Sequence, residues 1–142
     1  MDFGSTRSYP DNFIADYLEL IKCASELDRR GILHYSQKLG FLCGLESHRM
    51  QEAHCDSVES IGVPFASTLP YDFSKQKATS EIKNLIPVML KLRVVPPPRE
   101  SYSLHRKLAG IFLFASKLQA TMDCRKIFHE VIDERNRLIK SE

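Results

Sequence analysis

Apolar residues recur every three or four positions along most of this chain, a spacing typical of amphipathic α-helices. No stretch of useful length alternates between apolar and polar residues as a β-strand pattern would. The pattern predicts a mainly α protein with about six helices, expected over about 11–28, 29–39, 46–61, from 74 to before 96, from 101 or 103 to about 118, and from about 123.

Prolines, glycines and capping residues set the expected ends of these helices. Gly40 stands where a left-handed C-terminal cap is wanted, and Gly62 to Pro64 should close the third helix. Ser74 is expected to cap the fourth helix, which Pro87 should kink, and the prolines at 96–98 should stop it.

Two segments are expected to lie outside these helices. Residues 64–74 hold two prolines and three aromatic residues, which predicts an ordered loop held by Phe65, Tyr71 and Phe73. Residues 135–142 are expected to form a solvated, fraying tail. Since a three-proline run is too short to separate independent domains, residues 1–142 are treated as one unit.

Composition narrows the class of protein. The chain has 142 residues, enough for about one domain, and 43% hydrophobic with 27% charged residues is ordinary for a folded globular protein. A net charge of +2 offers no bulk attraction for nucleic acid, and no nucleic-acid partner is expected. The longest strongly apolar run, 111–115, is too short to span a bilayer, and the acidic first twenty residues resemble neither a secretory signal nor a transit peptide. The four cysteines are widely spaced, which favours free thiols.

The tripeptide Asp2-Phe3-Gly4 is the first candidate for chemistry. In kinase-fold enzymes the aspartate of this motif binds the magnesium ion of the nucleotide phosphates. Alone the motif is a weak signal, and the alternative is a solvated carboxylate close to the positive α-amino group of Met1.

Further blocks along the chain give the motif a context. The chain resembles the C-terminal lobe of the UbiB family, the aarF-domain-containing atypical kinases, and within it the coenzyme Q branch. The resemblance covers residues 2 to about 132 and rests on Asp2 to Gly4, Arg7, Tyr9, Phe41, Leu42, Gly44, Met50 to His54, Pro64, Phe65, Tyr71 to Phe73, and most specifically Pro96 to Leu108.

The resemblance implies a helical C-lobe of a protein-kinase-like fold in a parent that binds Mg-ATP. It further implies an ATPase or small-molecule kinase that supports ubiquinone biosynthesis at the matrix face of the mitochondrial inner membrane. Its expected partners are ATP and a lipid-like ubiquinone precursor or the coenzyme Q biosynthetic complex, with a possible peripheral membrane contact. Asp2 matches the magnesium ligand of the family, and no catalytic or other nucleotide-binding residue of the family maps onto this chain.

The family's nucleotide loop, ATP-anchoring lysine and catalytic loop belong upstream of Asp-Phe-Gly. The chain is therefore expected to be a partial domain that is inactive alone and binds no cofactor by itself. Only about six residues separate Gly4 from the first expected helix, and no Ala-Pro-Glu motif follows, which disfavours a polypeptide substrate.

Two polar clusters have competing interpretations. His48, His54, Cys55 and Asp56 could suggest a metal site, but His54 and Cys55 point about 100° apart on a helix, and a structural helix is favoured. The run from His105 to Lys107 could bind phosphate, but a solvated or loop-anchoring face is favoured, with Arg106 pairing a carboxylate.

The segment 110–115 is apolar nearly all round a helix, which predicts burial on several sides. It also motivates the alternative function, a non-catalytic helical module that binds a partner protein or a membrane lipid through this helix.

Overall fold

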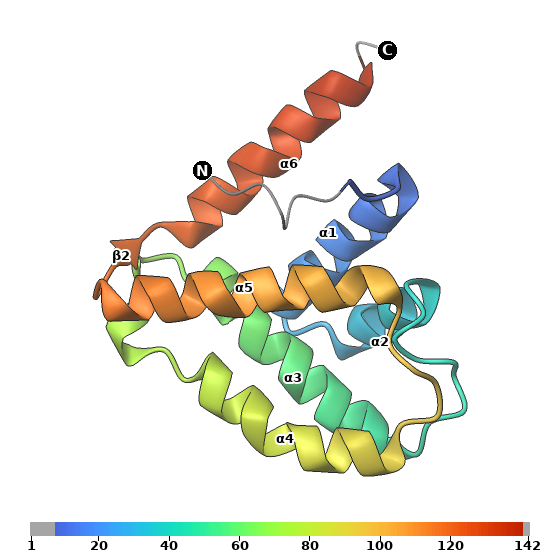
Figure 1. Ribbon diagram of the computed structural model, residues 1–142. Helices are drawn as coiled ribbons and strands as arrows, with labels where there is room; N and C mark the ends of the chain where they lie inside the picture. Colours follow the sequence, from blue (N-terminus) through green and yellow to red (C-terminus); the bar gives the residue numbers. More distant parts are fainter. Residues whose placement is uncertain (1–7, 141–142) are drawn as a thin grey trace.

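The computed structural model describes residues 8–140, and within them six α-helices carry the architecture (Figure 1). The elements in chain order are α1 (Asp11–Ser25), α2 (Arg29–Lys38), α3 (His48–Ala66), β1 (Tyr71–Asp72), the 3₁₀ turn η1 (Phe73–Lys75), α4 (Ala78–Leu92), α5 (Arg99–Lys117), β2 (Thr121–Met122) and α6 (Cys124–Lys140). The mainly α class predicted from the sequence is confirmed. None of the described helices is long and apolar enough to cross a membrane.

Helix α3 is the centre of the molecule, because both α1 and α4 pack along it. A first core cluster joins α1, α2 and α3 around Leu20, Ile32 and Val58, and a second joins α3 to α4 around Met50 and Met89. Figure 1 shows α3 and α4 side by side, with α5 crossing the same side of the molecule.

A third core cluster holds α5 and the start of α6 to the rest of the molecule. Phe73 from η1 packs edge-on against Phe112 of α5, with ring centroids 5.5 Å apart. Strands β1 and β2 pair antiparallel, Tyr71 opposite Met122, and Phe65 of α3 meets Phe128 of α6 at 5.1 Å. The aromatic residues expected to hold the loop at 64–74 therefore do so, although two short strands accompany them.

Several helix ends agree with the sequence prediction. Gly40 has a φ of +81° after α2, as a left-handed cap requires. The prolines at 96–98 separate α4 from α5, and the side chain of Asp123 accepts a hydrogen bond from the N–H of Lys126 at the start of α6.

Three predicted boundaries are wrong. Helix α3 continues through Gly62 and Pro64 to Ala66, because tight packing against α1 holds this turn in helical geometry. Ser74 lies in η1 and does not cap α4, whose N-cap is Lys77. Helix α5 begins at Arg99, because Pro98 has the extended backbone conformation of an N-cap residue, with φ −61° and ψ 146°.

The expected tail at 135–142 is helical as far as Lys140, within α6. Most side chains beyond Glu134 are exposed in this helix. Whether its last turns fray in solution stays a prediction.

Candidate functional site

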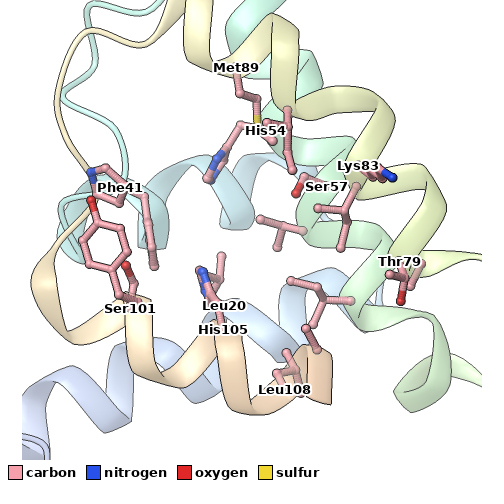
Figure 2. Close-up of a pocket in the computed structure, with 18 of the residues that line it drawn as sticks. Leu20, Phe41, His54, Ser57, Thr79, Lys83, Met89, Ser101, His105 and Leu108 are labelled. Atoms are coloured by element: carbon pink, nitrogen blue, oxygen red, sulfur yellow. The ribbon is translucent and has the colours of Figure 1, made fainter. Parts of the chain in front are cut away.

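A cavity of about 520 Å³, partly open to solvent, lies between α1, α3, α4 and α5. Its walls are mostly apolar, and its polar lining side chains include His54, Ser57, Thr79, Arg93 and His105. Figure 2 shows His54 of α3 and His105 of α5 pointing into this space from opposite sides. The volume lies within the range of about 300–1,000 Å³ that is usual for ligand pockets.

Aromatic rings form one wall of this cavity. The Phe41 ring, on the segment after α2, stacks on the His105 ring with centroids 5.4 Å apart and an interplanar angle of 11°. The ring centroid of His54 lies 6.2 Å from that of Phe41, and the ring centroid of Tyr17 on α1 lies 6.1 Å from that of His105. Residues from α1, α3, α5 and the loop after α2 thus meet only in the tertiary structure.

His54 is a buried, neutral group. Its side chain is on the inner face of α3, and its Nε2 atom lies 2.8 Å from the hydroxyl oxygen of Ser36 on α2, within hydrogen-bond distance. Burial, followed by the positive charge of Arg93, lowers the pKa of His54 to about 4. The imidazole is therefore uncharged at neutral pH.

Arg93 lies directly after α4 and lines the cavity. Its Nη1 atom is buried and has no hydrogen-bond partner among residues 8–140. The buried carboxylate of Glu46 does not serve as this partner. It accepts hydrogen bonds from the backbone N–H groups of Cys43 and Gly44, at 2.7 and 2.8 Å. Because a buried unpaired donor costs about 1–3 kcal/mol, Arg93 is the least satisfied polar group of the site.

The His105 side chain lines the cavity and is exposed to solvent on that side. Protein atoms around the rest of the ring displace much of the bulk water. This desolvation, followed by the positive charge of Arg93, lowers the pKa of His105. With both imidazoles neutral at pH 7, the positive charges of the lining belong to Arg93 and to the exposed Lys83.

The chemistry of this site favours binding over catalysis. The lining supplies a large apolar surface and a few donors, while none of the acidic residues that the structure describes belongs to it. Sequence reasoning missed Arg93 altogether. The only available signal was an arginine that directly ends an apolar helix, and such residues are common.

The structure places the other sequence candidates as follows. Asp2, the proposed magnesium ligand, lies outside the described residues, as do Phe3, Gly4 and Arg7. Among residues 8–140, no group of three or more His, Cys, Asp or Glu side chains could hold a metal ion.

The cluster on α3 is split between separate partners. His54 contacts Ser36, and Asp56 forms an ion pair with Arg29, which also pairs with Glu59 at 2.8 Å. Cys55 is buried, and this burial raises the pKa of its thiol to about 11.

The run His105-Arg106-Lys107 is also divided. His105 faces the cavity, whereas Arg106 is exposed and forms no hydrogen bond or ion pair with any residue that the structure describes. The expected carboxylate partner of Arg106 is therefore not found in this part of the chain.

The apolar segment 110–115 differs most from expectation. Phe112 and Ala115 are buried, but Ile111 is 61% and Phe114 64% exposed. Burial on several sides is therefore wrong for residues 8–140, because the described part of the chain packs against only one side of α5.

Comparison with known proteins shows similarity along almost the whole chain. It is 47% identical over 131 residues to "Atypical kinase coq-8, mitochondrial" of Caenorhabditis elegans, a match that covers 92% of this chain and 17% of that protein. It is also 47% identical over 131 residues to "Atypical kinase COQ8B, mitochondrial" of Danio rerio, covering 92% and 21% of the two chains. "Atypical kinase COQ8, mitochondrial" of Saccharomyces cerevisiae is 42% identical over 133 residues, covering 92% and 26%.

These matches confirm the resemblance to the UbiB-type atypical kinases. The chain spans about a sixth to a quarter of the length of these relatives, whose names place them in mitochondria. No family model matches the chain.

Proposed function

We propose that this chain, which is similar along nine-tenths of its length to one segment of the COQ8 atypical kinases, is the C-terminal lobe portion of such a kinase or ATPase. The parent protein would bind Mg-ATP and support coenzyme Q biosynthesis in mitochondria, at the matrix face of the inner membrane. The observation that carries the proposal is 42–47% identity spread over 92% of the chain. A mainly helical fold supports it, as expected of a kinase-like C-lobe.

Within this proposal Asp2 is the magnesium ligand. A carboxylate oxygen is a ligand that Mg²⁺ prefers, and Asp-Phe-Gly is the motif in which kinases present it. The ion would neutralise charge on the nucleotide phosphates. The remaining groups of the nucleotide site would come from the part of the parent that precedes this segment, so the 142-residue chain alone is expected not to turn over ATP.

The short connection after the motif bears on the substrate. Only residues 5–10 separate Gly4 from the first residue of α1. Protein kinases present their polypeptide substrates on a long activation loop at this point. A small molecule is therefore the favoured phosphoryl acceptor, if the ATP is not simply hydrolysed.

Replacement of a segment in a relative tests this function directly. In the Saccharomyces cerevisiae protein, the matching 133-residue segment is replaced by this chain, and ATP hydrolysis is measured. The hybrid should hydrolyse ATP, and Asp2→Asn should lower the rate by at least about a hundredfold, as loss of a key electrostatic group does. Asp11→Asn, an exposed carboxylate at the start of α1, is the matched control and should leave the rate unchanged.

Two results would contradict the proposal. ATP hydrolysis by the isolated 142-residue chain would show that the upstream part is not needed. Equal rates in the Asp2→Asn and Asp11→Asn hybrids would remove the magnesium role of Asp2.

One observation favours the alternative function, a non-catalytic helical module that binds a membrane or a partner protein. Ile111 and Phe114 of α5 and Leu118, the residue that directly follows the helix, lie three and four residues apart and are each more than 60% exposed. We call these three residues the α5 stripe. A stripe of this kind is an unusual surface for a free monomer and suits a membrane or protein contact. Binding of the chain to liposomes tests this alternative.

A further inference from the structure

The cavity between α1, α3, α4 and α5 combines an apolar body with a half-buried arginine that has no ion-pair partner in the described part of the chain, and this combination points to a class of ligand. Its apolar lining includes Leu20, Ile61, Ile82, Met89, Leu108 and Phe112. These side chains come from four helices, so the space is formed by the fold and not by one flexible loop. An apolar chain would replace water there at a gain in free energy.

The charge of the lining is one-sided. Arg93 and Lys83 are basic, and no aspartate or glutamate of residues 8–140 lines the cavity. Arg93 Nη1 is buried without a hydrogen-bond partner in the described part of the chain, so one N–H donor pair of a permanent cation is left unused. An anion in the cavity would supply the missing counter-charge to the Arg93 guanidinium.

Neutral polar groups also line the cavity. His105 forms no hydrogen bond with residues 8–140, and one of its ring nitrogens carries a proton when the ring is neutral. Ser101 cannot serve in the same way, because its hydroxyl already donates to the carbonyl of Pro98 at 2.6 Å. Arg93 and His105 are thus two of the donors that the lining offers a ligand, beside Lys83, Ser57 and Thr79.

We propose that this cavity binds a molecule with a single carboxylate head and an unbranched apolar tail, the head pairing with Arg93 and the tail lying among the α3, α4 and α5 side chains. A monoanion suits the site, because among the described lining residues Arg93 is the only cation that is not exposed. A volume of about 520 Å³ accommodates a tail of about twelve carbons. This ligand follows from the cavity lining, independently of the proposed Mg-ATP chemistry.

Isothermal titration of the purified chain with dodecanoate, below its micelle concentration, tests the proposal. Dodecanoate should bind at one site. 1-Dodecanol and methyl dodecanoate keep the tail and lose the charge, and each should bind at least about tenfold more weakly, as expected when a charge-assisted hydrogen bond is lost. This comparison needs no variant, so it holds even if a substitution impairs folding.

Substitutions then locate the head group. Arg93→Met should weaken dodecanoate binding by at least about tenfold and leave dodecanol binding nearly unchanged. Arg99→Met removes an exposed arginine at the start of α5, outside the cavity, and is the matched control. Circular dichroism of both variants checks that they are folded.

The proposal is overturned by any of three results. These are equal affinity for dodecanoate and dodecanol, equal effects of Arg93→Met and Arg99→Met on dodecanoate binding, or no binding of dodecanoate. Because no nucleotide is used, each result is independent of whether the chain belongs to an active ATPase.

Discussion

His54 shows how one residue changes meaning between sequence and structure. On the sequence it stands beside Cys55 and Asp56 and could suggest a metal site. In the fold it lies within hydrogen-bond distance of Ser36, while Arg93 and His105 disfavour its charged form and Glu46 favours it. Its neutral form is therefore part of the packed interior, and protonation should oppose folding.

This burial predicts a pH dependence of stability. The pKa of His54 falls from 6.5 in the unfolded chain to about 4 in the folded one, so the folded state binds fewer protons. The contribution is fully present above about pH 6.5 and is lost as the pH falls towards 4. At about 1.4 kcal/mol per pH unit, His54 should account for about 3 kcal/mol of this loss.

Urea unfolding at pH 7 and at pH 4.5 measures the effect. His54→Gln can keep a hydrogen bond to Ser36 but does not titrate, so its free energy of unfolding should fall less over this interval than that of the parent chain. His48→Gln, with a side chain that is 84% exposed, should behave like the parent. Identical pH profiles for all three proteins would show that His54 is not the titrating group.

At the scale of the elements, the packing of α1 against α3 decides where α3 ends. A Cβ atom on Gly62 would lie 2.6 Å from the carbonyl carbon of Ala24 and 2.8 Å from its oxygen. The two helices can approach this closely only because residue 62 has no side chain. The same contact keeps the turn at Pro64 helical, although the sequence contains a helix breaker there.

Gly62→Ala should therefore destabilise the chain by about 1–3 kcal/mol, because backbone atoms of α1 and α3 must move apart. Gly110→Ala is the matched control. A Cβ there would meet nothing within 4 Å on an exposed part of α5, and the substitution should stabilise the chain by up to about 1 kcal/mol. Thermal unfolding followed by circular dichroism measures both. A stabilising Gly62→Ala would refute the close contact.

At the scale of the whole molecule, apolar residues are distributed unevenly. The first two core clusters bury residues of α1 to α4, whereas α5 and α6 have buried residues on one side only. Figure 1 shows the C-terminal end of α6 extending beyond the other helices, and Arg135 of α6 donates a hydrogen bond to the backbone carbonyl oxygen of Asp11 at the start of α1, at 3.2 Å. The α5 stripe is thus available to a membrane or to another polypeptide, which in the proposed parent includes the remaining part of the protein.

Flotation with anionic liposomes tests the membrane alternative. If the α5 stripe inserts, Phe114→Glu should lower the bound fraction by about tenfold or more, since it removes the burial of an aromatic side chain. Leu45→Glu makes the same change at a residue that is 83% exposed in the loop before α3, and should bind like the parent. Equal losses in both variants, or no binding by the parent chain, would count against a membrane role for this stripe.

Local signals predicted the elements well, because helix formation depends on spacing and caps that lie within a few residues. The six helices, the left-handed Gly40 and the stop at the prolines were all predictable in this way. The end of α3 was not, since it depends on Ala24, nearly forty residues away in the chain. Burial of α5 was overestimated, because periodicity shows which residues are apolar and not what covers them.

The sequence by itself determined the helical class and, through blocks from Asp2 to Leu108, the resemblance to atypical kinases that the comparisons confirm. Both conclusions follow from the identity and spacing of residues along the chain. Only the tertiary structure decided that Arg93, His54 and His105 line one cavity, and that the α5 stripe is exposed. These residues lie on separate segments, and their proximity and solvent exposure follow from how the helices pack, which no local pattern specifies.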